Sequence, residues 1–177
     1  TEKYVEALET TYPQYEKIKK NKSSRYYQLI TNLIGDIYYQ TKKNDKSIFF
    51  YKESLSYYNY NNYLNNDFSK LKKDSIDSFL SRTYLQLGSL FQKKMKNISN
   101  NNNLHPKDSA IYYYRKLENL NSILNNSLKY KAISYYNLSG IFLDQKQYKK
   151  AETYALKAID IHKTDNDEIN LASSLNN

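Results

Sequence analysis

The hydrophobic positions of this chain recur at intervals of three and four residues over three long stretches, 26–39, 76–91 and 133–142. A second amphipathic stretch follows each of them, at 46–58, 108–120 and 148–162. Such spacing places apolar side chains on one face of an α-helix. The pattern therefore predicts an all-α fold of antiparallel helix pairs. In the first stretch, the predicted packing face consists of Tyr26, Leu29, Ile30, Leu33, Ile34, Ile37 and Tyr38.

Polar residues mark where helices begin and where loops lie. Ser23 or Ser24 is the predicted N-cap of the first helix, because its hydroxyl can accept a backbone N–H bond. Asp74, with Asp77 three residues later, is the predicted capping pair of the second long stretch. The Asn-rich segment 97–106 is the predicted loop within the second pair, since consecutive Asn residues and Pro106 favour turns.

Small residues recur at matching places in the three pairs. The sets are Gly35, Ser47 and Ser54; Gly88, Ala110 and Leu117; and Ser139, Ala151 and Ala158. The intervals are twelve and seven residues in the first and third sets, and 22 and seven in the second, where the Asn-rich loop lies. Small side chains let two helices approach closely, so we expect these positions where the helices of each pair cross. Leu117 is the exception in size.

These residues resemble the tetratricopeptide repeat family. The third pair matches most fully, with YYNLSGIF at 135–142, QYKKA at 147–151 and LKAI at 156–159. The resemblance covers residues 24–162 and implies a right-handed α-α superhelix, or solenoid, of helix hairpins. Two features differ from the family pattern. No pair carries its closing Pro, and successive pairs are 53 and 51 residues apart, rather than about 34.

The resemblance also implies how the chain is organised. Residues 1–177 are expected to form a single domain and to be a slice of a longer array. The expected divisions are the end of a preceding unit at 1–22, repeats at 24–66, 68–125 and 128–163, and the start of a following unit at 167–177.

Composition narrows the classes of function. The 177 residues have a net charge of +9, but only three of the 27 basic residues are Arg. Arg makes the forked contacts that phosphates favour, so nucleic-acid binding through the basic surface is the less favoured interpretation. The absence of Cys excludes disulfides and thiolate chemistry. No apolar run is long enough to span a membrane.

Signals of catalysis are weak. The chain has no glycine-rich phosphate loop, HExxH motif or nucleophile elbow. Its two histidines, His105 and His162, have no second histidine at metal-ligand spacing. His105 is interpreted as a loop residue, and His162 as the end of a helix. We therefore expect a non-enzymatic protein with no cofactor and no metal.

Binding is the better-motivated function, because stacked hairpins form a groove lined by their first helices. The partner is expected to be a protein or peptide, and self-association is a further expectation. Asn and Gln can bind an extended backbone, and Tyr offers an apolar ring with a polar tip. The candidate groove residues are Asn32, Asp36, Tyr39, Gln40, Arg82, Gln86, Ser89, Gln92, Tyr136, Asn137 and Asp144.

The Lys-, Asn- and Tyr-rich composition resembles that of repeat arrays in regulatory proteins of Bacteroidetes-type bacteria. The resemblance implies the sensor or scaffold region of a larger signalling or transcription-regulatory protein, with the repeats on the periplasmic side of a membrane anchor. A cytoplasmic scaffold or chaperone-like adaptor is the alternative.

Overall fold

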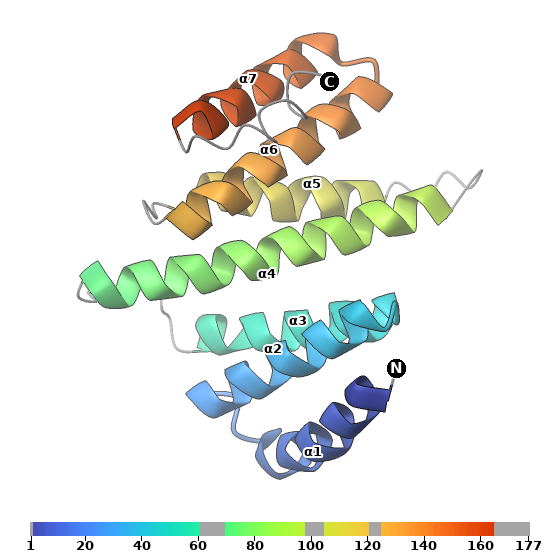
Figure 1. Cartoon of the computed structure of the whole chain (residues 1–177), viewed down its shortest axis with the longest axis vertical. Coiled ribbons are helices and arrows are strands. Elements are labelled where there is room, and N and C mark those ends of the chain that lie inside the picture. The colour runs from blue at the N-terminus through green and yellow to red at the C-terminus, as the bar shows by residue number, and fades with distance from the viewer. Residues whose placement is uncertain (1, 61–69, 98–104, 121–124, 165–177) are drawn as a thin grey trace. The chain divides into compact units, whose positions relative to one another are not determined.

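The computed structural model describes residues 2–60, 70–97, 105–120 and 125–164 (Figure 1). Its helices are α1 (Glu2–Ile18), α2 (Arg25–Gln40), α3 (Asn44–Tyr60), α4 (Lys70–Asn97), α5 (His105–Glu118), α6 (Asn125–Asp144) and α7 (Tyr148–Thr164). No strand occurs among the described residues, and the predicted all-α fold class is confirmed.

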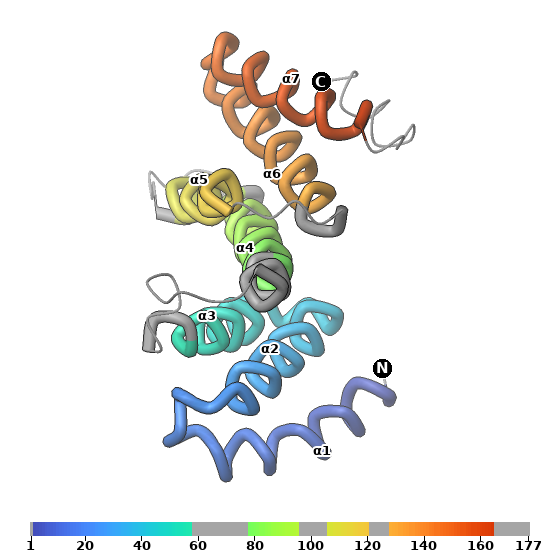
Figure 2. Tube along the Cα trace, turned by 90° about the vertical axis from the view of Figure 1, so that its left-hand side faces the viewer, coloured from blue at the N-terminus to red at the C-terminus, as the bar shows by residue number. Residues whose placement is uncertain are grey.

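The chain divides into two compact units, unit 1 (Thr1–Phe68) and unit 2 (Ser69–Asn177). In unit 1, α2 packs against α3 on one side and against α1 on another. In unit 2, α4 pairs with α5 and α6 pairs with α7, while α6 also contacts α4 and α5 (Figure 2). Each predicted first helix therefore pairs with the helix that follows it in sequence.

Two predicted helix boundaries differ from the structure. α4 begins at Lys70, so Asp74 lies inside the helix rather than at its N-cap. α5 already includes His105 and Pro106, so the loop predicted over 97–106 ends earlier. Proline fits the first turn of a helix, where its missing N–H would have no intrahelical partner. The remaining loop residues, and the start of a further unit at 167–177, lie outside the described residues.

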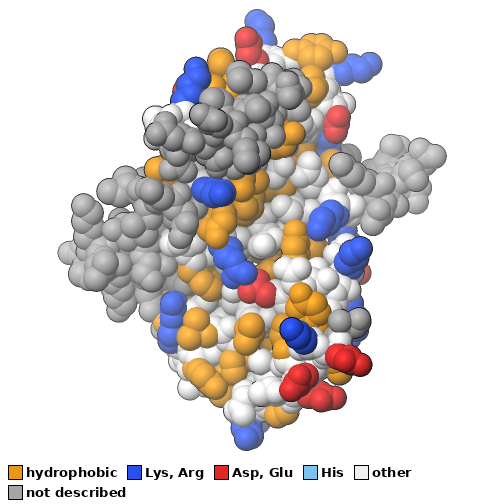
Figure 3. All heavy atoms as spheres, viewed as in Figure 1, with side chains coloured by type: hydrophobic (Ala, Val, Ile, Leu, Met, Phe, Trp, Pro, Cys, Tyr) orange, Lys and Arg blue, Asp and Glu red, His pale blue; other side chains and the backbone are white. Residues whose placement is uncertain are grey.

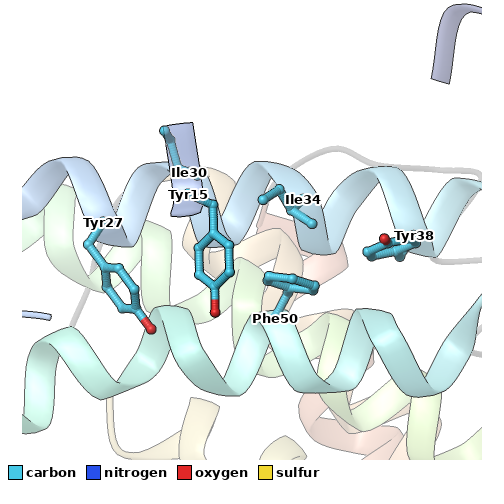
Figure 4. Close-up of a cluster of buried hydrophobic side chains, with 6 residues drawn as sticks. All are labelled: Tyr15, Tyr27, Ile30, Ile34, Tyr38 and Phe50. Carbon is cyan, nitrogen blue, oxygen red and sulfur yellow. The ribbon is translucent and has the colours of Figure 1, made fainter. Parts of the chain in front are cut away.

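The core of unit 1 is largely aromatic. Tyr15 of α1 packs between α2 and Phe50 of α3, and its ring lies 5.3 Å from that of Phe50 (Figure 4). Phe50 also stacks on Tyr38 of α2 at 5.7 Å. Leu8 and Ile18 of α1 pack on the same cluster. The buried members of the cluster are Tyr15, Tyr27, Ile30, Ile34, Tyr38 and Phe50.

Small residues lie where α2 and α3 meet. The Ser47 hydroxyl, early in α3, donates to the Gly35 carbonyl late in α2 at 2.9 Å. The Ser54 hydroxyl, late in α3, donates to the Gln28 carbonyl early in α2 at 3.1 Å. These pairings fix an antiparallel hairpin. The other small residues of the three sets are also buried, which confirms the prediction that they lie at packed positions.

Two of the hairpins place a tyrosine ring against a glycine. A Cβ atom on Gly35 would lie 2.9 Å from the Tyr51 ring of α3, and one on Gly88 would lie 2.4 Å from the Tyr114 ring of α5. The third hairpin has Ser139 at the glycine position and Ala155 at the tyrosine position. A bulky ring on the second helix is thus paired with a glycine on the first, and the larger serine occurs where the ring is replaced by alanine.

The turns of the first and third hairpins share one backbone geometry. After α2, the N–H of Lys43 donates to the Tyr38 carbonyl and that of Lys42 to the Tyr39 carbonyl. Gln147 and Lys146 repeat both bonds after α6. Lys42 and Lys146 each have a φ of 58°. This is the Schellman arrangement, with lysine at the left-handed position where glycine is usual.

Candidate functional site

One face of α2 carries apolar side chains that the hairpin packing leaves half-exposed. We call it the α2 row, and its members are Tyr26, Leu29, Leu33, Asp36 and Gln40. Successive members are three or four residues apart, so they form one stripe along the helix. Tyr26 is 53% exposed, Leu29 48% and Leu33 46%. The stripe therefore begins with three half-exposed apolar side chains and ends with polar ones.

The packing of the other faces of α2 explains this exposure. Gly35 faces Tyr51 of α3, and a helical residue turns by about 100° around the axis. Leu33 precedes Gly35 by two residues and so points about 160° away from α3. The intervening face, which carries Ile30 and Ile34, packs in the cluster with α1. Neither α1 nor α3 therefore buries the apolar members of the α2 row, whereas Asp36 of the same row bonds to Tyr51 of α3.

The equivalent rows of the other first helices are more polar or less exposed. Taking the same distances from Gly88 and Ser139, they consist of Phe79, Arg82, Gln86, Ser89 and Lys93 in α4, and Tyr130, Ile133, Asn137, Gly140 and Asp144 in α6. The apolar members Phe79, Tyr130 and Ile133 are less exposed than the leucines of α2. Only in α2, among these three described rows, do two aliphatic side chains stand half-exposed.

The candidate groove residues differ in exposure. Gln40 and Asp144 are exposed, and Asn32 is buried. Asn32 lies four residues after buried Gln28 and three before buried Gly35, which puts it on their side of α2 rather than on an outward face. The half-buried candidates are Asp36, Tyr39, Arg82, Gln86, Ser89, Gln92, Tyr136 and Asn137.

Three candidates in unit 2 converge on one buried tyrosine. The Tyr114 hydroxyl donates to Gln92 Oε1 at 2.8 Å and accepts from Asn137 Nδ2 at 3.1 Å. Ser89 Oγ lies 3.4 Å from the same hydroxyl oxygen. In unit 1, Asp36 accepts a hydrogen bond of 2.6 Å from Tyr51. These polar groups therefore stabilise the tyrosine rings that cover the helix glycines, a role that spacing alone did not indicate.

A partly buried glutamate joins α2 and the turn before it to α3, beside the core of unit 1. Glu53 accepts hydrogen bonds from the Tyr27 hydroxyl and from Lys22 Nζ, the latter at 2.9 Å. Burial alone would raise the pKa of Glu53, but these two bonds and the charge of Lys22 outweigh it, so the pKa lies below its usual value. Burial and the neighbouring carboxylate raise the pKa of the Tyr27 hydroxyl. The charged carboxylate therefore favours the folded hairpin.

A comparable contact occurs in unit 2. Glu118, in the last turn of α5, accepts from the Tyr154 hydroxyl at 3.1 Å and from Lys157 Nζ at 2.9 Å. The hydrogen bond to Glu118 raises the pKa of Lys157. Both units thus use a tyrosine, a glutamate and a lysine to join helices.

Sequence reasoning placed Tyr26, Leu29 and Leu33 in the packing face, and the structure shows that placement to be wrong. Gly35 indicates the correct packing face, because a glycine at a helix crossing shows which side of α2 contacts the neighbouring helix. Apolar residues across the helix from that glycine must point elsewhere. Of the adjacent tyrosines in α2, Tyr27 and Tyr38 are the buried ones.

The described residues contain no cluster of three or more His, Asp or Glu side chains arranged to hold a metal ion. His162 is buried in the last turn of α7, and the backbone of His105 begins α5. Among the described helices, none combines the length and apolarity needed to cross a bilayer.

The hairpins, with small residues at their crossings, define a helical repeat protein. Residues 31–61 and 132–165 match the family model described as tetratricopeptide repeat. These segments contain most of the α2–α3 hairpin and most of the α6–α7 hairpin, and the resemblance to that family is confirmed for both. The α4–α5 hairpin lies outside the matched segments. No curated protein matches the chain.

Proposed function

We propose that this protein is a non-enzymatic interaction module that binds a protein or peptide segment through outward faces of its first helices. The observation that carries this proposal is the α2 row. The helix α2 already packs against α1 and α3 on its other sides. Leu29 and Leu33 stay half-exposed, so they contribute little to the packing of unit 1. Half-exposed aliphatic side chains gathered in one stripe are typical of surfaces that meet another molecule.

Selection from a random peptide library displayed on phage tests this function directly. The intact chain is immobilised, and enriched peptides are synthesised and titrated by calorimetry. We expect dissociation constants in the range of about 1–100 μM, as for modest interfaces. Failure to enrich any sequence over beads without the chain would contradict the proposal.

The remaining candidate residues can be assigned by substitution. Gln40→Ala in unit 1 and Asp144→Ala in unit 2 are suitable because both side chains are exposed. We expect each to weaken a selected peptide that contacts its helix while leaving the helical circular dichroism unchanged. Asn137→Ala is less suitable, because its amide also bonds to Tyr114.

We also propose that the chain serves as the sensor or scaffold region of a larger bacterial signalling or transcription-regulatory protein. Its support is the Lys-, Asn- and Tyr-rich composition together with the two matched repeats. The complete reading frame tests this context. A membrane anchor and an output domain in the same frame would support it, whereas a frame of repeats alone would favour the adaptor.

A further inference from the structure

The space-filling view shows hydrophobic side chains exposed over α1 and α2, in the lower half of the picture (Figure 3). In the α2 row the apolar members lie at positions i, i+3 and i+7. Along the helix axis, Tyr26 and Leu29 are about 4.5 Å apart and Leu29 and Leu33 about 6 Å apart. The side chains of another helix repeat at the same intervals, whereas those of an extended strand repeat at about 6.6 Å on each face. A helical partner can therefore match all three positions.

The charges around α2 indicate what kind of helix the partner is. Residues 19–46, which comprise α2, both flanking turns and the first three residues of α3, carry seven Lys or Arg and two Asp, a net charge of +5. The basic residues lie at the two ends and all are exposed: Lys19, Lys20, Lys22, Arg25, Lys42, Lys43 and Lys46. Lys19 and Lys22 contact Glu16 and Glu53. Counting these two carboxylates lowers the net charge from +5 to +3, so an excess of positive charge still flanks the apolar stripe.

The size of the stripe argues against a second copy of this chain as the occupant. Three half-exposed side chains offer roughly 300 Å² of surface. A stable dimer buries about 800 Å² on each partner. A single helix of about 16 residues, which spans about 24 Å, matches both the area and the length of α2.

We infer that the α2 row binds a short amphipathic helix with a leucine-type stripe in its middle and acidic residues at both ends. This inference rests on the proposed function and names the chemistry of its partner. The stripe of the partner seats on Tyr26, Leu29 and Leu33, and its acidic ends face the basic turns.

The test uses a fluorescein-labelled, stapled helical peptide of about 16 residues, the length that spans α2. It carries leucines at i, i+3 and i+7, glutamates in its first and last turns, and Gln or Ala elsewhere. Two matched peptides replace the glutamates by lysines or scatter the leucines around the helix. Binding to the intact chain is measured by fluorescence anisotropy. We expect the acidic peptide to bind about tenfold more tightly than either matched peptide and to weaken as salt rises.

The double variant Leu29→Gln/Leu33→Gln removes the apolar surface while keeping good helix formers. We expect it to bind the acidic peptide about tenfold more weakly, with unchanged thermal unfolding. Leu156→Gln is the matched control, because Leu156 is an exposed leucine of α7 in unit 2. Lys42→Gln/Lys43→Gln should weaken binding of the acidic peptide and strengthen binding of the lysine-ended one, because it removes two positive charges.

Several results would overturn this inference. They are absent binding of the acidic peptide, equal binding by the Leu29/Leu33 double variant, and displacement of the peptide by duplex DNA of similar length. A dimer in sedimentation velocity that dissociates in the double variant would make a second copy the occupant. If library peptides bind equally well to the α2 variants, the inference about the α2 row is wrong but the proposed interaction function stands. If the library yields no binders, both the inference and the proposed function are wrong.

Discussion

Gly88 and Gly140 both lie inside helices of unit 2, in opposite surroundings. A Cβ at Gly88 would meet the buried Tyr114 ring at 2.4 Å, whereas one at Gly140 would meet nothing within 4 Å. We expect Gly88→Ala to lower the free energy of unfolding by about 1–3 kcal/mol through overpacking. Gly140→Ala should raise it by up to about 1 kcal/mol, because Ala favours the helix. Urea unfolding measures both, and equal signs would contradict the packing described here.

Gln28 is a second residue with a clear energetic consequence. Its side chain is fully buried, and neither amide atom has a hydrogen-bond partner among the described residues. A buried polar group without a partner costs about 1–3 kcal/mol. We expect Gln28→Met to raise the free energy of unfolding by about 1 kcal/mol. Gln40→Met serves as the control, because Gln40 is exposed. If Gln28→Met destabilises the protein and Gln40→Met does not, the Gln28 amide has a hydrogen-bond partner and the expectation is wrong.

At the residue scale, the sequence predicted some roles and missed others for one physical reason. Gly35 and Ser47 were recognisable because small residues at a repeated interval signal a helix crossing. Gln92 and Asn137 look like solvent-facing amides in sequence, but they bond to Tyr114. Long-range hydrogen bonds of this kind depend on which helix lies opposite, and that information is absent from local spacing.

At the scale of elements, the turns after α2 and α6 are less stable than they could be. Lys42 and Lys146 occupy left-handed backbone conformations that cost an L-residue about 1–2 kcal/mol. We expect Lys42→Gly and Lys146→Gly each to raise the midpoint of thermal unfolding, with a gain of up to about 1 kcal/mol after the greater flexibility of glycine in the unfolded chain is counted. Lys43→Gly is the control and should not stabilise. A lower midpoint for both Gly variants at the left-handed positions would argue against the Schellman geometry.

Periodicity was sufficient to predict the helices, and less so their ends and orientation. Ser24 caps α2 as expected, with its hydroxyl accepting from the Tyr26 N–H at 3.2 Å. The Schellman turns were not predicted, because lysine gives no signal for a left-handed position. The outward stripe of α2 was missed because seven apolar positions were assigned to one face, although they span about half of the helix circumference.

At the scale of the whole chain, acid should act on unit 1 through Glu53. Its folded-state pKa lies below the unfolded value of 4.5, so its stabilising effect is present above that pH and is lost as pH falls below it. We expect Glu53→Gln to flatten the decline of stability between neutral pH and about pH 3. Hydrogen exchange followed by mass spectrometry should place the change in α2 and α3. An unaltered pH profile, or a change confined to α6 and α7, would contradict this assignment.

Each unit contains buried residues of its own, from the aromatic cluster of unit 1 to Leu117 and Leu138 in unit 2. The repeat divisions expected from sequence remain predictions at this scale. They depend on how successive hairpins stack, and only contacts distant in sequence carry that information. The match to a repeat family at two separate segments supports the hairpin as the recurring element.

Facing positions in the hairpins constrain how such chains diverge. Two hairpins place a glycine opposite a tyrosine, and the third has serine and alanine at the same places. A larger residue can enter the first helix only when its neighbour across the crossing shrinks at the same time. Gly88→Ser should therefore cost less stability in a Tyr114→Ala background than it does beside the Tyr114 ring. In homologous hairpins, we therefore expect a larger side chain on one helix to be accompanied by a smaller one at the facing position of the other helix. The distance between the two helices would then stay the same.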